Sequence, residues 1–155
     1  MNSSTVKHYR IPQFAVRLVK EQNLITTVPK IVRQPEDAYR ILQPVFAELT
    51  VEHFVAMLLN TKNHVLGIST ISCGSLNASI VHPRELFRVA LLHGGTTASL
   101  ILAHNHPSTD PAPSPEDIAL TSKLVEAGKL LEIPILDHII CCENRFVSLR
   151  EKGYI

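Results

Sequence analysis

Two histidines separated by one residue, His104 and His106, have a type and spacing that suit metal chemistry. Side chains at positions i and i+2 lie on the same side of an extended chain, about 6–7 Å apart. Two imidazoles placed in this way can converge on one metal ion. The alternative is that each is an ordinary core histidine, because a short His-x-His pattern also arises by chance.

Ser114 and Asp117 follow within the run Ser-Pro-Glu-Asp. A serine, a proline and then an acid are typical of a helix N-terminus, and capping alone would explain both residues. First-turn side chains also project outward, so Asp117 would face the histidines if the intervening loop folds back. The two interpretations are compatible, because Ser114 can cap a helix and still offer its hydroxyl to a substrate oxygen.

Two nitrogen ligands, one oxygen ligand and a water make a catalytic zinc site with an open position. Zinc lowers the pKa of its bound water to about 7, so hydroxide is available at neutral pH. We therefore predict that His104, His106 and Asp117 bind one Zn²⁺ per chain.

Such a site also needs a carboxylate base that does not bind the metal. Glu52 is the best candidate, because it opens an apolar run on the same side as Phe54, where a carboxylate is costly without a partner or a function. The alternative is a strand-edge glutamate that reaches water. Glu48 and Glu85 are weaker candidates, both expected on helices near solvent.

The pattern of apolar residues predicts the elements that position these side chains. Helices are expected to begin at Gln34-Pro35, at Pro83 and at Ser114. Strands are expected over residues 52–59, 65–72, 77–81, 98–103, 135–141 and 145–149, with the first two forming a hairpin. Helices and strands are interleaved, which indicates an α/β domain with one mixed sheet.

Three further features have structural interpretations. Residues 11–16 are expected to form an extended piece at a sheet edge, because Pro12 excludes a central strand. Gly128 lies inside the third helix, where glycine costs about 1 kcal/mol relative to alanine. Asp137 and His138 lie in a buried strand, and we expect a structural hydrogen-bonded pair in preference to a role in holding a ligand imidazole.

Length and charge suggest how the chain is organised. The 155 residues, 45% of them apolar, fit one compact domain with a core. Residues 1–33 hold six basic residues against Glu21, a net charge of +5, so the rest carries −4. We divide the chain into a basic N-terminal arm, residues 1–33, and a domain, residues 34–155. The arm is either a solvated segment over the domain or a weak contact to DNA or an acidic partner.

The sequence also bounds the location of the protein. No apolar run is long enough to span a bilayer, and the N-terminus lacks the apolar core of a signal peptide. A cytoplasmic protein with no membrane contact is therefore expected. The three cysteines are predicted to be reduced, partly buried thiols, because neighbouring cysteines rarely pair with each other and no Cys-x-x-Cys occurs. They also cannot supply the four well-spaced ligands of a zinc ribbon.

The run His104-x-His106, seven residues, Ser114-x-x-Asp117 resembles the JAMM (MPN+) motif of JAB-domain zinc metalloproteases. The wider context, at residues 82–85, 103–108, 113–114 and 137–138, is similar to the bacterial RadC-like branch of that family. The resemblance covers residues 35–155. It implies that the two histidines and the aspartate bind zinc, that Ser114 helps to stabilise the tetrahedral intermediate, and that an upstream glutamate, here Glu52, acts through the water. It also implies a single JAB/MPN-type domain, a mixed central sheet flanked by helices, with a cytidine-deaminase-like architecture.

One departure from the family pattern concerns the N-terminus. Full-length RadC proteins carry a helix-hairpin-helix domain, a non-specific DNA binder, before the JAB domain. This chain has only some 33 residues there, so it resembles the short, stand-alone members, and the family's DNA-repair label transfers poorly.

The expected function is that of a zinc metallopeptidase or isopeptidase acting on a protein or peptide substrate. One alternative is a DNA-repair or other nucleic-acid-associated factor. If it were a two-metal nuclease, it would want a second carboxylate cluster about 4 Å from the first. Another is a non-catalytic, zinc-stabilised interaction module, which the presence of all ligands and a candidate base disfavours.

Overall fold

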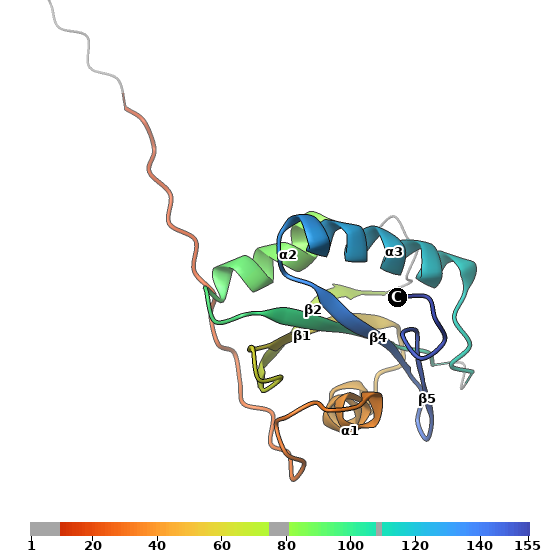
Figure 1. The fold of residues 1–155 in the computed structure, drawn as a ribbon. Coiled ribbons are helices and arrows are strands. Elements are labelled where there is room, and N and C mark those ends of the chain that lie inside the picture. Colours follow the sequence, from red (N-terminus) through yellow and green to blue (C-terminus); the bar gives the residue numbers. More distant parts are fainter. Residues whose placement is uncertain (1–9, 75–80, 108–109) are drawn as a thin grey trace, which may run out of the picture.

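A computed structural model describes residues 10–74, 81–107 and 110–155 (Figure 1). The helices are α1 (Pro35–Phe46), α2 (Pro83–Leu92) and α3 (Pro115–Leu130). The strands are β1 (His53–Leu59), β2 (Val65–Cys73), β3 (Ser99–Asn105), β4 (Ile135–Cys141) and β5 (Phe146–Ser148). The strand predicted over residues 77–81 falls almost wholly outside the described residues, and the other predicted strands are present with ends shifted by one or two residues. Among the described residues, no helix is both long and apolar enough to cross a membrane.

The five strands form one sheet in the order β2-β1-β3-β4-β5. Neighbouring strands are antiparallel except β3 and β4, which are parallel. A parallel pair needs a crossover connection, and α3 provides it. Because α3 begins soon after β3 ends, the first turn of α3 lies near the carboxyl end of β3.

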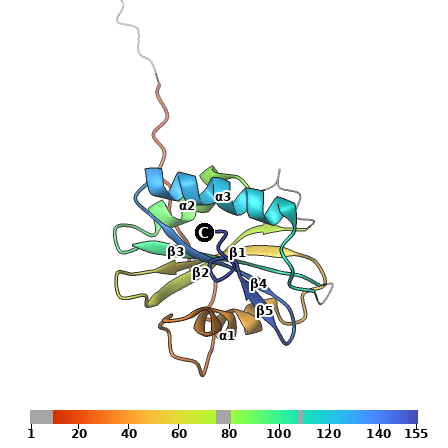
Figure 2. The ribbon, with the colours of Figure 1, turned by 45° about the vertical axis from the view of Figure 1, so that its right-hand side comes forward.

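Helices cover both faces of the sheet, with α1 on one side and α2 and α3 on the other (Figures 1 and 2). The odd-numbered residues of β1 pack in the cluster that α1 covers. Its even-numbered residues pack in the cluster that α2 and α3 cover. A strand buried on both faces needs an almost unbroken apolar sequence, which β1 has. The predicted α/β fold with a mixed central sheet is therefore confirmed.

Gly128 has a role that the sequence did not reveal. A Cβ atom at this position would lie 2.7 Å from the Ile133 backbone oxygen and 3.3 Å from Cζ of Phe87. Glycine thus lets the end of α3 pack against the turn into β4. The interpretation of Gly128 as only a helix-propensity cost was therefore incomplete.

The first described residues of the arm extend away from the body of the molecule (Figures 1 and 2), whereas Val28 and Val32 near its end pack against the core. Ile11 is 89% exposed and Phe14 83% exposed. The prediction of a sheet-edge piece over residues 11–16 was wrong, because within the described chain these residues pair with no strand. Pro12 disfavours strand pairing, and the described part of the arm first pairs with the sheet at the isolated bridge between Ile31 and His64.

Candidate metal centre

His104 and His106 lie where β3 ends, His104 within the strand and His106 just after it. Their Nε2 atoms are 2.9 Å apart, so the two rings converge as the i, i+2 spacing predicts. The side chain of His104 is fully buried, whereas that of His106 is 14% exposed. The pair therefore reaches from the core to the surface.

The first turn of α3 brings Asp117 to the same place. Its Oδ1 atom is 3.4 Å from His104 Nε2, and its Oδ2 atom is 3.7 Å from His106 Nε2. One ligand atom from each of the three residues lies within 4.8 Å of the others. The structure thus brings together the three side chains that the sequence singles out.

The outer nitrogen of His106 is already committed to donating a hydrogen bond. His106 Nδ1 lies 2.7 Å from the backbone oxygen of Asp110. A carbonyl oxygen only accepts, so Nδ1 carries the hydrogen. A neutral imidazole has one N–H, and His106 Nε2 therefore presents a lone pair to the cluster.

A longer chain of buried groups reaches the outer nitrogen of His104. The Thr121 hydroxyl donates to the Asp117 backbone oxygen at 2.6 Å, so its own oxygen is left to accept from His138 Nδ1, also at 2.6 Å. The Nε2 atom of neutral His138 then accepts from His104 Nδ1 at 2.8 Å. Burial lowers the pKa of His138 well below its usual value and that of His104 to about 4, so both rings are neutral at neutral pH. The lone pair of His104 Nε2 therefore also faces the cluster.

Two imidazole nitrogens without hydrogen and a carboxylate oxygen face one another, an arrangement that a cation would stabilise. Ligand atoms on a tetrahedral zinc ion with Zn–N bonds of about 2.0–2.1 Å would be roughly 3.3 Å apart. The separations of 2.9 Å between the two nitrogens and 3.4 Å between His104 Nε2 and Asp117 Oδ1 lie near that value, and one ligand atom from each residue lies within 4.8 Å of the others. The donor set therefore fits zinc if Asp117 Oδ1 and His106 Nε2 draw together on binding. The contact with the Asp117 carboxylate, which outweighs burial, raises the pKa of His106, as do the Asp110 carbonyl and Glu52.

Ser114 and Asp117 form the predicted capping box. The backbone N–H and the hydroxyl of Ser114 donate to Asp117 Oδ2 at 2.8 and 2.7 Å, and Ser114 Oγ accepts from the Asp117 backbone N–H at 3.1 Å. The cap occupies Oδ2 and leaves Oδ1 for a cation. Burial alone would raise the pKa of Asp117, but the two histidines and Ser114 hold it well below its usual value. The capping and metal-binding interpretations are therefore geometrically compatible.

Glu52 immediately precedes β1, which begins one residue later than predicted. Its side chain is half-buried and lies near enough to His106 to raise the pKa of that residue. Its backbone oxygen accepts from the Gly74 N–H at 2.9 Å. Continued alternation places Glu52 on the face of the sheet that carries Phe54 and His104.

The two weaker candidates for the base have other surroundings. Glu85 lies on α2 and forms ion pairs with Arg88 at 2.7 Å and with Arg84 at 3.6 Å. Glu48 is exposed just after α1, the helix on the opposite face of the sheet. Neither arrangement favours them over Glu52.

Asp137 and His138 form a hydrogen-bonded pair through the His138 backbone N–H, and their side chains contact different groups. The Asp137 carboxylate accepts from the Ser148 hydroxyl at 2.6 Å and from the backbone N–H groups of His138 and Arg150 at 2.7 and 3.1 Å. Adjacent strand residues point to opposite faces, so the His138 ring is free to contact His104. The interpretation that we favoured less, in which this pair holds a ligand imidazole, describes the contact between His138 and His104.

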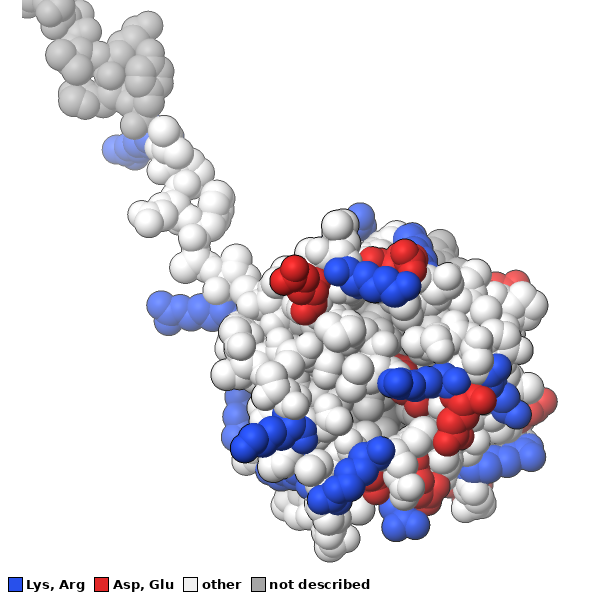
Figure 3. Space-filling model, in the orientation of Figure 1, with Lys and Arg blue, Asp and Glu red and all other residues white. Residues whose placement is uncertain are grey.

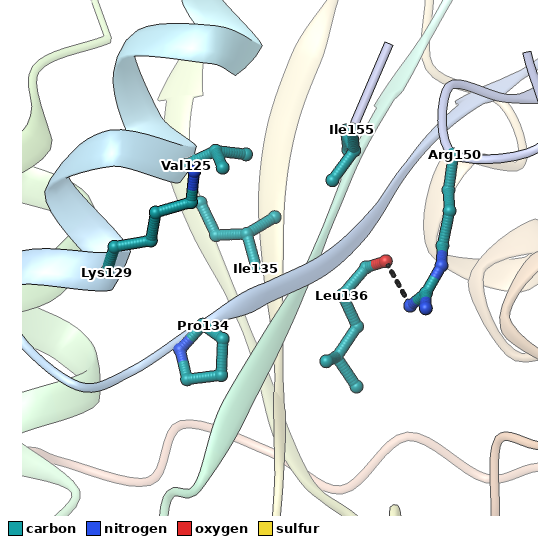
Figure 4. Close-up of a pocket in the computed structure, with 7 residues that line it drawn as sticks. All are labelled: Val125, Lys129, Pro134, Ile135, Leu136, Arg150 and Ile155. Atoms are coloured by element: carbon teal, nitrogen blue, oxygen red, sulfur yellow. Dashed lines mark hydrogen bonds between the residues drawn. The ribbon is translucent and has the colours of Figure 1, made fainter. Parts of the chain in front are cut away.

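Elsewhere in the described part of the chain, no second group of three metal-binding side chains comes together. A hollow of about 250 Å³ lies between the end of α3 and the start of β4 (Figure 4), where Arg150 donates to the Leu136 backbone oxygen at 3.0 Å. No Asp, Glu, His or Cys lines it. On the face of the body seen in Figure 3, basic and acidic side chains are interspersed, which differs from the single-sign patch typical of a DNA-binding surface.

Comparison with known proteins places the chain in a family. Residues 32–154 match the RadC-like JAB domain. The chain belongs to this family. This RadC-like JAB domain is 52% identical over 139 residues to a UPF0758 protein of Methanococcoides burtonii, covering 89% of this chain and 60% of that protein. It is 55% identical over 125 residues to a UPF0758 protein of Desulforamulus reducens, which covers 81% of this chain and 54% of that protein. It is 52% identical over 141 residues to a UPF0758 protein of Listeria innocua, which covers 90% of this chain and 62% of that protein. The chain thus spans only 54–62% of these relatives, whose names specify no reaction.

Proposed function

We propose that this RadC-like JAB domain is a zinc-dependent hydrolase that cleaves peptide or isopeptide bonds. The observation that carries the proposal is the convergence of His104 Nε2, His106 Nε2 and Asp117 Oδ1. The outer nitrogens of both rings are committed to donating, so three lone pairs face one point. Two nitrogens and one oxygen are a ligand set of catalytic zinc sites.

The surrounding residues are suited to hydrolysis of an amide. A zinc ion bound by the cluster would supply a Lewis acid and lower the pKa of a bound water. Glu52 takes a proton from the attacking water and delivers it to the leaving amine. The Ser114 hydroxyl turns from Asp117 Oδ2 to donate to the carbonyl oxygen of the substrate as that oxygen gains charge. The partly exposed His106 marks the side from which substrate approaches.

The two rival functions make different demands on the chain. A two-metal nuclease needs a second group of metal-binding side chains, and the described residues form no second group of this kind. A non-catalytic zinc-stabilised module would keep the cluster but would turn over no substrate, so only an activity measurement distinguishes it.

Metal content tests the ligand assignment. The purified chain and a His64→Ala control, in which an exposed histidine outside the cluster is changed, should each carry one zinc per chain. The His104→Ala, His106→Ala double variant should carry none. Full zinc retention in the double variant would overturn the assignment.

Cleavage profiling tests the reaction. The zinc-loaded chain is incubated with a library of peptides and isopeptides, in parallel with chelated protein, chelated protein with zinc restored, and Glu52→Gln. Cleavage should require zinc and Glu52. Stoichiometric zinc with no cleavage of any library member would favour the non-catalytic module.

A further inference from the structure

Strands β1 and β3 separate at the candidate site. Their ladder ends at the pair Phe54–His104. Beyond it, the His106 N–H donates to the Cys141 backbone oxygen of β4 at 2.9 Å, so the chain that leaves β3 follows β4 and departs from β1. The segment that contains Glu52 therefore lies across a fork from the two histidines.

The side chain of Asn105 bridges this fork. Its Oδ1 accepts from the His53 N–H at 2.7 Å, and its Nδ2 donates to the Val51 backbone oxygen at 3.0 Å. Asn105 is 6% exposed, so its amide is largely withdrawn from water, although Val51 is itself exposed. The Asn105 amide thus supplies one acceptor and one donor, as the next backbone pair of the β1–β3 ladder would have done. It does so where the two backbones are farther apart than in the ladder.

The residue held by this amide is Glu52. Asn105 binds the backbone on both sides of it, at Val51 and at His53. From the opposite side, the Gly74 N–H donates to the Glu52 backbone oxygen. The backbone of residues 51–53 is therefore fixed between β3 and the end of β2.

We propose that Asn105 is a positioning residue that spans the β1–β3 fork and holds Glu52 at a set distance from the His104, His106 and Asp117 cluster. The proposal deepens the proposed function and rests on it for the role of Glu52. Alanine cannot form either bond, and aspartate keeps the acceptor for His53 but faces the Val51 oxygen with a second oxygen. Both changes release the segment while leaving the cluster side chains in place.

A matched control comes from the β1–β2 hairpin. Asn60 Oδ1 accepts from the backbone N–H groups of Lys62 and His64 at 2.9 and 3.0 Å, which is also an asparagine side chain that fixes a backbone segment. Hydrogen exchange at the His53 amide is compared among wild type, Asn105→Ala and Asn60→Ala. Loss of a hydrogen bond worth about 1 kcal/mol speeds exchange roughly fivefold, and this should occur in Asn105→Ala alone. Unchanged exchange at His53 would overturn the proposal.

Zinc titration and kinetics separate positioning from a merely structural role. In Asn105→Ala, zinc affinity should stay within about threefold of wild type, and kcat should fall on the order of tenfold to a hundredfold with KM nearly unchanged. In a Glu52→Gln background the same change should lower kcat no further, because its effect acts through Glu52. An equal loss in both backgrounds, or faster exchange with normal kcat, would reject positioning. A wild type that binds zinc but cleaves nothing would contradict the proposed function, whereas the exchange measurement tests the bridge by itself.

Discussion

Replacing Thr121 with valine should weaken zinc binding although Thr121 touches no cluster nitrogen. Valine keeps the shape of threonine but removes the hydroxyl that accepts from His138 Nδ1. His138 can then move its proton to Nε2 and donate to His104 Nδ1. In that arrangement His104 carries its hydrogen on Nε2, the atom that faces the cluster, and cannot bind a metal there.

The size of the effect follows from the cost of reversing this change. Zinc binding requires the hydrogen to return to His104 Nδ1, which leaves the fully buried His138 Nδ1–H without an acceptor. An unsatisfied buried donor costs about 1–3 kcal/mol, or a factor of roughly 5–150 in affinity. Loss of groups that orient metal ligands typically weakens binding about 10–100-fold, which agrees. The metal-free variant should lose less unfolding free energy than this, because the two imidazoles can change tautomer and keep their hydrogen bond.

Thr97→Val is the matched control, since the Thr97 hydroxyl also contacts a histidine, His93 Nδ1, at 3.1 Å. Zinc affinity is measured by competition with a chelator, and ¹⁵N NMR of the imidazoles reports which nitrogen of His104 carries the hydrogen. Wild-type zinc affinity in Thr121→Val, or an equal loss in Thr97→Val, would refute the reasoning.

Four further predictions address the base, the buried rings, the core and the arm. Glu52→Gln should retain zinc but lose about 10²–10⁴-fold in turnover, and full activity on the same preparation would assign the base to another residue. The unfolding free energy of the metal-free protein should fall as pH drops from 6.5 to about 4, because His104 and His138 bind protons in the unfolded chain but stay neutral when buried in the folded protein. The expected slope is on the order of 1.4 kcal/mol per pH unit for each ring, and it should be shallower in His104→Gln. Gly128→Ala should lower stability in thermal denaturation by about 1–3 kcal/mol through overpacking, whereas a pure propensity effect would raise it. We also propose that the arm binds DNA weakly and in a salt-dependent manner, so deleting residues 1–33 should abolish a low-salt mobility shift and leave zinc bound; an unchanged shift would place DNA binding elsewhere.

The sequence was sufficient to predict the parts of the site that local rules govern. The i, i+2 rule placed His104 and His106 on one side of the chain, and the capping signature placed Asp117 on the first turn of α3. Apolar periodicity predicted the hairpin, the buried strands and the mixed sheet. Each of these depends on residues that are close in sequence.

The groups that surround the cluster could not be found in this way. Asn105 reaches a segment 52 residues away, and His138 contacts His104 across 34 residues. Such contacts depend on which strands become neighbours, and no local pattern fixes that. One signal was available for Asn105: an amide between two convergent histidines, at the end of a buried strand, must find partners. The strand rule that adjacent side chains point to opposite faces also allows His138 to contact His104 while Asp137 faces the other way.

The parallel pairing of β3 and β4 has a consequence for the order of folding. His104 belongs to β3 and His138 to β4, so the ring of His104 is held only after the chain has crossed over through α3 and β4 has docked. Non-local parallel pairing is a slow event because loop closure precedes the contacts that reward it. We therefore expect competent zinc binding to appear late in folding, after the rate-limiting step. A metal that binds so late should leave the refolding rate almost unchanged and slow unfolding instead, giving kinetic protection to the loaded protein.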